Sequence, residues 1–340
     1  MKNKTNLKII FLGTPEFGAT ILKKLIEYIP SFVLSPYVSS FSLSLHGPFQ
    51  PVFVITAPDK PAGRKKILTP PPVKILAEKY NIPVLQPEKI KNYKFTIEGY
   101  EPDLIVVAAY NEILPKEILE IPKYGSLNLH PSLLPRWRGP SPVQHTILAG
   151  DKEAGVTIIL MDEKIDHGPI IASTKYEAES LKVPYRELEN KLANLGAKLL
   201  VETIPKWING DIKPVPQDNS KVTFSKILKR EDGKIDWKMP AIGIERQVRA
   251  FEGWPESFCL YCEEKKCLRL KILKVNVLKQ TSKGPFGSPG KTFLAPDSKI
   301  AVQTGKDFLI ITELQLEGKK STTSEDFLRG RTDFIGTILK

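Results

Sequence analysis

The sequence predicts an α/β protein in which a Rossmann-like domain with a mostly parallel sheet precedes a small, OB-like β-barrel. The first observation is that short apolar runs alternate with helical patterns over the first two-thirds of the chain, which is typical of a parallel sheet covered on both faces. The second is a polar, Pro-containing segment after which short strands dominate. The third is the length of 340 residues, which favours two domains.

Several apolar runs in the first two-thirds have the length of buried strands: residues 7–12, 51–56, 103–109, 125–130 and 155–161. Helical patterns lie at residues 16–27 and before Tyr80, and the other gaps are long enough for crossover connections. Ligands bind beyond the carboxyl ends of the strands in such sheets. We therefore expect the catalytic groups in the segments that follow these strands.

A long helical pattern begins at residue 184, and the polar segment GDIKPVPQDNSK after it is typical of a linker. The predicted division is residues 1–208 for the first domain, 209–222 for the linker and 223–340 for the barrel domain. Strands of the barrel are expected at residues 256–262, 269–278, 299–304 and 308–314. Helices are expected at residues 241–251 and near the end of the chain, where Ser321 or Thr322 would cap a helix ahead of Glu325.

The charge balance favours an anionic partner. The chain holds 50 Lys and Arg against 38 Asp and Glu, a formal net charge of +12. Residues 207–340 hold 24 basic and 17 acidic residues, so the C-terminal part is the more basic per residue. A basic barrel is typical of nucleic-acid binding, and a solvated charged face is an equally good interpretation of charge alone.

The cellular compartment is predicted from cysteine usage and from the N-terminus. Three cysteines do not make a disulfide framework, and no signal peptide precedes the first strand, so we expect a cytoplasmic protein. Residues 28–58 contain no Asp, Glu, Lys or Arg, but four prolines break any continuous apolar helix there. Serines alternate with apolar residues at 40–45, which indicates an added hairpin or loop rather than a membrane segment.

Two loops at the expected sheet edge could bind anions. FLGTPEFG opens a helix with free backbone N–H groups but lacks the G-x-G-x-x-G spacing, so a tight turn is the alternative. The loop after residues 51–56 carries Lys60, Arg64, Lys65 and Lys66 between prolines, where four cations could grip a phosphate backbone. Its position after a strand favours this interpretation over a merely solvated loop.

The polar pair Asn128 and His130 ends a predicted strand. Residues two apart on a strand point to the same side, and an amide donor beside an imidazole suits the oxyanion of a tetrahedral intermediate. A structural hydrogen-bonded pair is the alternative. Asp166 lies on the loop after the next strand, from which its carboxylate could return to His130 and orient the ring.

Motifs along almost the whole chain carry a family resemblance: GTPEFG, PDKPAGR, AAYNEILPKEIL, LNLHPSLLPRWRGPSPVQ, GVTIILMDEKIDHGPII, IDW and RAFEGWP. With these motifs in this order, the chain resembles the methionyl-tRNA formyltransferase family. The motif from Asn128 to Pro142 is shared in outline by folate-dependent formyltransferases, so it indicates the superfamily. IDW and RAFEGWP, together with the basic C-terminal domain, favour the tRNA enzymes.

The resemblance implies formyl transfer from 10-formyltetrahydrofolate to the α-amine of methionyl-initiator tRNA, for translation initiation, by a monomer that needs no metal. It implies the catalytic set Asn128, His130 and Asp166. The residues implied to bind folate are Tyr110, Asn111, Ile113, Leu114, Ser132, Leu133, Leu134 and Pro135. Those implied to bind tRNA are Lys60, Arg64, Lys65 and Lys66, with Arg64 as the leading contact and the C-terminal domain holding the acceptor stem.

The chain departs from the family pattern at two places. His167 and Pro169 stand where Thr and a second acidic residue are common, which affects the secondary hydrogen bonds of the loop rather than Asp166. The uncharged insertion around residues 30–50 makes its segment about twenty residues longer than a usual strand-helix-strand unit, and we predict no function for it.

Cysteines and tryptophans of the C-terminal part have competing interpretations. Cys259, Cys262 and Cys267 suggest zinc, but no fourth ligand has suitable spacing, so a hairpin with Cys262 opposite Cys267, both reduced, is favoured. We expect Trp237 and Trp254 in the core rather than stacked on bases.

Two other functions stay open on the sequence alone. The first is a folate-dependent formyltransferase or hydrolase acting on a small amine or water, with the same catalytic set. The second is a non-catalytic RNA-binding protein that keeps the fold. The basic C-terminal part argues against the first alternative, and the intact set of Asn128, His130 and Asp166 argues against the second.

Overall fold

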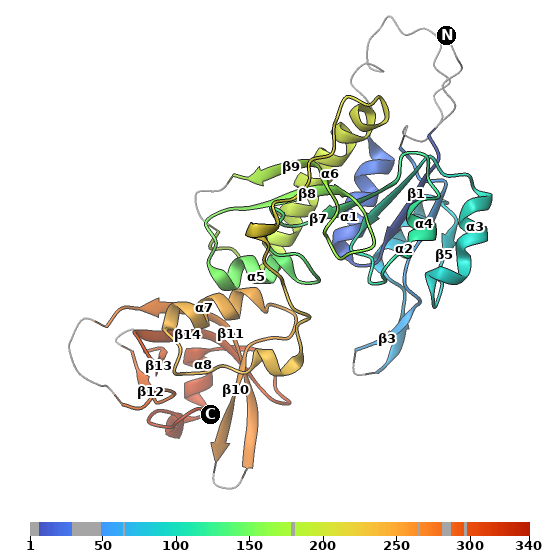
Figure 1. Cartoon of the computed structure of the whole chain (residues 1–340). Helices are drawn as coiled ribbons and strands as arrows, with labels where there is room; N and C mark the ends of the chain where they lie inside the picture. Colours follow the sequence, from blue (N-terminus) through green and yellow to red (C-terminus); the bar gives the residue numbers. More distant parts are fainter. Residues whose placement is uncertain are drawn as a thin grey trace, which may run out of the picture. The chain divides into compact units, whose positions relative to one another are not determined.

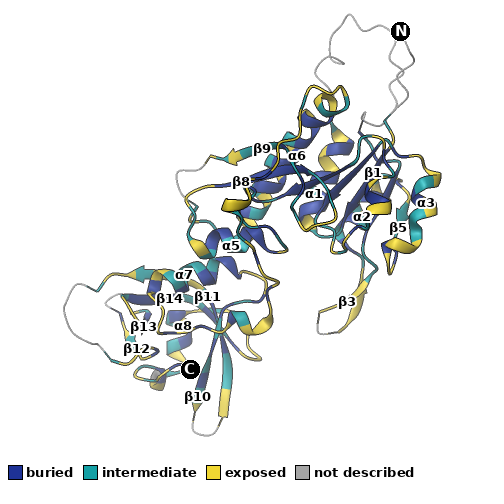
Figure 2. Ribbon diagram, viewed as in Figure 1, coloured by how far each residue is buried: buried dark blue, intermediate teal, exposed yellow. Residues whose placement is uncertain are grey.

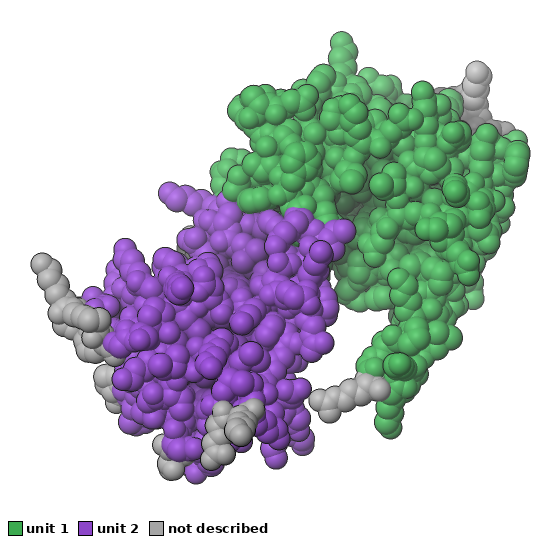
Figure 3. All heavy atoms as spheres, turned by 60° about the horizontal axis from the view of Figure 1, so that its bottom comes forward, with its two compact units in different colours: residues 1–142, 153–178, 189–225 green, residues 143–152, 179–188, 226–340 purple. Residues whose placement is uncertain are grey.

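A computed structural model describes residues 7–28, 49–63, 65–177, 181–263, 266–280, 287–295 and 298–340. The chain divides into two compact units, coloured separately in Figure 3. Unit 1 comprises residues 1–142, 153–178 and 189–225, and unit 2 comprises residues 143–152, 179–188 and 226–340. The predicted linker, residues 209–222, clusters with unit 1. Among the described residues, no helix is long and apolar enough to cross a membrane.

Unit 1 is built on a seven-stranded sheet with the order β5-β2-β1-β6-β7-β8-β9 (Figure 1). The strands are β1 (Ile9–Gly13), β2 (Phe53–Ile55), β5 (Val84–Leu85), β6 (Leu104–Ala108), β7 (Ser126–His130), β8 (Ala154–Leu160) and β9 (Ile170–Tyr176). Pairings from β5 through β7 are parallel, while β8 and β9 are antiparallel to their neighbours. The mostly parallel Rossmann-like sheet predicted from the sequence is confirmed.

Helices cover both faces of this sheet. They are α1 (Glu16–Glu27), α2 (Pro72–Lys79), α3 (Lys94–Gly99), α4 (Lys116–Leu119), α5 (Pro142–Ala149) and α6 (Tyr185–Ile208), the last two of which extend across the unit boundary. Alternate residues of β1 enter different cores: Ile9 and Phe11 pack with Leu22 of α1, whereas Ile10 and Leu12 pack with Ile97 of α3. The central strands are buried throughout (Figure 2), so their apolar runs are continuous.

The strand order reverses beside β1, which is where open α/β sheets bind their ligands. The turn from β1 to α1 needs glycine here: a Cβ on Gly13 or on Gly18 would lie 2.8 Å from the carbonyl oxygen of Ala108. FLGTPEFG therefore brings the start of α1 close against the end of β6. A further hairpin, β3 (Lys60–Ala62) and β4 (Ile67–Thr69), follows β2.

Unit 2 contains an antiparallel six-stranded sheet, ordered β10-β11-β14-β13-β12 with β15 paired to β14. Its strands are β10 (Phe258–Glu263), β11 (Lys266–Leu278), β12 (Thr292–Leu294), β13 (Ile300–Gln303), β14 (Phe308–Leu316) and β15 (Thr322–Thr323), with helices α7 (Ala241–Ala250) and α8 (Ser324–Arg329). The β-rich second domain is confirmed. The predicted cap of α8 was wrong by one residue: the Thr323 side chain accepts a hydrogen bond from the Asp326 amide, because the short strand β15 occupies Thr322 and Thr323 and the helix begins only after it.

The two tryptophans of unit 2 differ in burial. Trp237 is 4% exposed and lies in the core, as predicted. Trp254 is 55% exposed, so its predicted core position is wrong. It follows Gly253, whose φ of +83° belongs to the turn after α7, and its Nε1 donates to the carbonyl oxygen of Leu228 at 3.3 Å. The turn places the ring at the surface.

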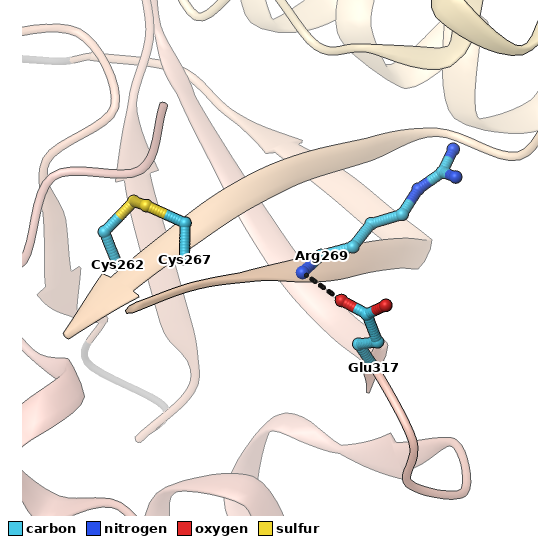
Figure 4. Close-up of a disulfide and its surroundings, with 4 residues drawn as sticks. All are labelled: Cys262, Cys267, Arg269 and Glu317. Atoms are coloured by element: carbon cyan, nitrogen blue, oxygen red, sulfur yellow. Dashed lines mark hydrogen bonds between the residues drawn. A yellow bond between two sulfur atoms is a disulfide. The ribbon is translucent and has the colours of Figure 1, made fainter. Parts of the chain in front are cut away.

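Cys262 and Cys267 face each other across β10 and β11, as predicted, but their sulfur atoms form a disulfide (Figure 4). The prediction that both are reduced was wrong, because direct pairing across two antiparallel strands brings the sulfurs within bonding reach. Beside them the Arg269 amide donates to Glu317 at 3.1 Å. Cys259 is buried, which raises its pKa, and in the described part of the chain no group of His, Cys, Asp or Glu is arranged to hold a metal.

The predicted hairpin at residues 40–45 and the insertion around residues 30–50, up to residue 48, lie outside the described residues. Tyr28 and Phe49, on either side of that gap, stack with ring centroids 5.4 Å apart. The chain therefore leaves α1 and returns toward β2 at neighbouring points of unit 1.

Candidate active site

The candidate site begins at the carboxyl end of β7. Asn128 pairs with Val107 of β6 on one side and with Ile159 of β8 on the other, and His130 pairs with Thr157. Both side chains are buried, at 9% and 5% exposure. As predicted from their spacing, they lie on the same side of the strand, and the flanking strands fix their backbone.

Asp166 joins them from the loop between β8 and β9. Its Oδ1 accepts a hydrogen bond from Asn128 Nδ2 at 3.2 Å and lies 3.5 Å from His130 Nδ1. Its Oδ2 accepts a 2.7 Å hydrogen bond from the backbone amide of Gly139. The carboxylate thus contacts three donors at 13% exposure of its side chain, and the structure brings together all three residues predicted to be catalytic.

The backbone of this loop is unusual. Asp166 has a φ of +48°, the left-handed region that non-glycine residues seldom adopt. Gly168 approaches the sheet so closely that a Cβ there would lie 1.8 Å from the Leu160 carbonyl oxygen. His167, which departs from the family pattern, contacts Asp162 through Nδ1 at 2.6 Å across the same loop.

The two ring nitrogens of His130 have different partners. Nε2 lies 2.9 Å from the carbonyl oxygen of Trp137, which can only accept, so Nε2 carries a hydrogen. Nδ1 lies 3.5 Å from the Asp166 carboxylate. The ring is therefore held between the Trp137 carbonyl on one side and the Asp166 carboxylate on the other.

The residues predicted to bind folate fall into two groups. After β7, the Ser132 hydroxyl donates to Arg136 at 2.6 Å, and the Leu134 amide donates to Thr157 at 3.1 Å. Ser132 and Leu134 are buried, while Leu133 and Pro135 are partly exposed. These contacts fix the backbone of the segment beside His130.

The second group follows β6 at the point where the strand order reverses. Asn111 and Ile113 are exposed, Tyr110 is partly buried, and Leu114 is 2% exposed within a core cluster. Burial raises the pKa of the Tyr110 phenol, and the neighbouring Glu112 carboxylate raises it further. The exposed Asn111 and Ile113 are accessible to a ligand, whereas Leu114 supports the loop from the core.

The predicted tRNA-binding lysines lie on the β3–β4 hairpin. Lys60, Lys65 and Lys66 are exposed, and Arg64 lies outside the described residues. At its base Asp59 accepts two hydrogen bonds from Lys74 Nζ, at 3.0 and 2.9 Å, and one from Gln86 at 2.7 Å. These hydrogen bonds, that of Gln86 first, lower the pKa of the Asp59 carboxyl.

Groups that the sequence did not predict hold the catalytic loop in place. They are the Gly139 amide, the Trp137 carbonyl and the side chains of Arg138 and Gln217. Trp137 and Gly139 act through backbone atoms, which no side-chain pattern could indicate. Arg138 stands in the motif after His130, but nothing in the sequence indicates that its side chain is buried, at 5% exposure.

Two models of protein families match this chain and give the class of protein. Residues 41–204 match the formyl transferase family, and residues 227–332 match the formyl transferase C-terminal domain. The first match contains Asn128, His130 and Asp166, and the second contains all the strands of the unit 2 sheet, β10 to β15. The fold and the site therefore define a two-domain formyltransferase.

The particular family follows from a full-length relative. A protein named methionyl-tRNA formyltransferase from Bacillus velezensis is 40% identical over 336 residues, which cover 98% of this chain and 97% of that protein. The chain belongs to the methionyl-tRNA formyltransferase family. The enzyme class predicted from the sequence, formyl transfer to methionyl-tRNA, is confirmed.

Solved structures support the fold at low identity. HypX from Aquifex aeolicus, in complex with tetrahydrofolic acid, has a TM-score of 0.60 and 16% identity, covering 97% of this chain and 48% of its own, so this chain spans about half of HypX. WlaRD, a sugar 3N-formyl transferase crystallised with dTDP and 5-N-formyl-THF, has a TM-score of 0.58 and 20% identity, covering 93% and 100%. Both have the architecture of this chain.

Proposed function

We propose that Asn128, His130 and Asp166 catalyse transfer of the formyl group of 10-formyltetrahydrofolate to the α-amine of methionyl-initiator tRNA. The observation that carries this is the convergence of an amide donor, an imidazole and a carboxylate on one buried point at the end of β7. Acyl transfer needs donors for an oxyanion and an acceptor for a proton, and these three side chains supply both. No nucleophilic side chain is required, because the amine itself attacks.

The donors act on the formyl oxygen. When the α-amine attacks the formyl carbon, negative charge develops on that oxygen, and Asn128 Nδ2 and His130 Nδ1 are the side-chain donors at the site. Both are buried, so their hydrogen bonds to the developing charge are stronger than in water. His130 needs no reorientation, since Trp137 already holds its other nitrogen.

The Asp166 carboxylate accepts the proton that the amine loses. Attack leaves the α-nitrogen with a proton that must depart before the tetrahedral carbon can collapse, and Asp166 is the acceptor beside both donors. The free α-amino group titrates at about 7.7–8.0, so a modest base suffices. Collapse breaks the bond from the formyl carbon to N10 of the folate, whose electron pair takes up a proton. One C–N bond forms and one breaks.

The binding roles are assigned by position. The loops that would contact folate follow the neighbouring parallel strands β6 and β7, the second of which carries Asn128. The folate compounds named with HypX and WlaRD support a folate donor. The exposed lysines 60, 65 and 66 suit tRNA phosphates. We assign acceptor-stem binding to the predicted domain 223–340, and propose that the enzyme works as a cytoplasmic monomer.

The test is transfer of labelled formyl from 10-formyltetrahydrofolate to charged initiator tRNA, with charged elongator tRNA and a small amine as parallel acceptors. We expect label on initiator methionyl-tRNA well in excess of both. Label that appears only on the small amine, or is released to water, would favour the small-acceptor enzyme instead. Absence of transfer to every acceptor would reject catalysis altogether.

A further inference from the structure

Gln217 lies in the segment that the sequence marks as a linker, yet its side chain is built into the catalytic unit. Val215, two residues earlier, pairs with Ile170 at the start of β9 through two backbone hydrogen bonds of 2.8 and 2.9 Å. This pairing carries the chain past the loop that holds Asp166. The Gln217 side chain is 9% exposed.

The amide of Gln217 uses its full hydrogen-bonding capacity. Its Nε2 donates to the carbonyl oxygens of Asp166 at 2.9 Å and Gly168 at 2.8 Å. Its Oε1 accepts from Arg138 Nε at 3.1 Å and Nη2 at 2.9 Å. A guanidinium only donates and a carbonyl only accepts, so the orientation of the amide is settled by its partners.

These hydrogen bonds fix the backbone of the Asp166 loop on both sides of His167. Asp166 holds a left-handed φ of +48°, a conformation that persists only where its surroundings fix it. Arg138, in turn, precedes Gly139, whose backbone amide donates to Asp166 Oδ2. Gln217 therefore joins the two segments that contact the Asp166 carboxylate.

The backbone after Gln217 strengthens the same connection. The Thr223 carbonyl accepts from the Arg138 amide at 2.9 Å, and the Ser225 amide donates to the Arg138 carbonyl at 2.7 Å. The Thr223 hydroxyl accepts from the Trp137 amide at 2.9 Å. The segment that leads to the C-terminal part thus pairs with the chain whose backbone contacts His130 and Asp166.

We propose that Gln217 is a positioning residue for Asp166, and that the supposed linker from Val215 onward is a structural part of the catalytic site. This rests on the proposed role of Asp166. Gln217 touches no reacting atom in this account. It acts by fixing the Asp166 loop against Arg138, so its loss displaces the carboxylate from the amine that it must deprotonate.

The first measurement compares Gln217→Ala with Asn209→Ala, an exposed amide earlier in the same segment. We expect Gln217→Ala to lower kcat roughly 10–100-fold, since small misplacements of a catalytic group have effects of this size. The KM for tRNA and for folate should stay within about twofold, and Asn209→Ala should match the wild type. A kcat for Gln217→Ala within about twofold of wild type would overturn the proposal.

A second variant separates loop positioning from loss of the partner of Arg138. Gln217→Glu keeps an acceptor for Arg138 but, when ionised, has no hydrogen for the carbonyls of Asp166 and Gly168. We expect it to fold and still to lose kcat by roughly 10–100-fold at neutral pH. Full activity in this variant would contradict the proposal, whether or not Gln217→Ala folds.

The third measurement tests whether Gln217 acts through Asp166. In an Asp166→Asn background, Gln217→Ala should lower kcat by less than about twofold further, because residues acting as a unit are not additive. If Gln217→Ala lowered kcat by the same factor in the wild type and in Asp166→Asn, Gln217 would have only a general structural role. If Asp166→Asn alone keeps wild-type activity, the proposed function fails first, so the two failures are distinguishable.

Discussion

The β7 site and the β3–β4 hairpin use polar side chains in opposite ways. Asn128, His130 and Asp166 are buried and are held by hydrogen bonds within unit 1 before any substrate arrives. Lys60, Lys65 and Lys66 extend from a short exposed hairpin whose base is fixed through Asp59. The first arrangement suits chemistry, which needs fixed geometry, and the second suits contact with a charged, extended partner.

After the loss of Asp166 itself, the largest expected effect comes from the oxyanion donor. Asn128→Ala removes a buried donor and should lower kcat by about 10²–10³-fold, the usual cost of losing one such group. The KM for tRNA should change little, because the amide acts on charge that develops only in the transition state. The matched control is Asn276→Ala, an exposed amide on β11, which should leave kcat unchanged. An effect on KM with an unchanged kcat would show that Asn128 binds substrate and does not stabilise the transition state.

The hairpin lysines should affect affinity instead of rate. Lys65→Ala combined with Lys66→Ala should weaken tRNA binding and lower the slope of log K against log salt by about one for each phosphate that the variant no longer neutralises. The kcat at saturating tRNA should stay within about twofold. Lys198→Ala, an exposed cation on α6, is the control for removal of a positive charge elsewhere on the surface. A salt slope equal to that of wild type would show that these lysines contact no phosphate.

The disulfide in unit 2 should affect stability alone. Replacing Cys262 and Cys267 by Ser removes a crosslink over a sequence separation of 5, which in the chain-entropy model lowers the free energy of unfolding by about 2 kcal/mol at most. Thermal unfolding of the variant should match that of the reduced wild type. Neither change should alter kcat, and a lowered kcat at full tRNA saturation would contradict this separation.

The smallest expected effect is on thermal stability at acidic pH, through Asp59 at the base of the hairpin. Hydrogen bonds from Gln86 and then Lys74 lower the Asp59 pKa below 3.8, so the ionised form is favoured by folding. Their contribution is present above pH 3.8 and is lost as the pH falls through the lowered value. The melting temperature of Gln86→Ala should therefore lie below that of wild type at neutral pH and approach it in acid. A constant difference across this range would mean that Asp59 titrates normally.

The sequence predicted those parts of the site that depend on strand periodicity. Two-residue spacing put Asn128 and His130 on one side of β7, and the loop after the next strand supplied Asp166. It could not predict Gln217, since its hydrogen-bond partners lie 49, 51 and 79 residues away and meet it through the tertiary pairing of Val215 with Ile170 and of Thr223 and Ser225 with Arg138. The exposure of Trp254 and the cap at Thr323 depended on local turns whose ends shift by a residue or two.

The separation of chemistry from docking is tested most directly by single-turnover formylation with Asp166→Asn, beside Glu163→Gln, an exposed acid in the same loop, and the lysine variant of the hairpin. At saturating tRNA, Asp166→Asn should lower the rate by about 10²–10⁴-fold with an unchanged Kd for tRNA. Glu163→Gln should behave as wild type, and the hairpin variant should keep its rate while its Kd rises. An Asp166→Asn rate equal to that of Glu163→Gln would contradict the account.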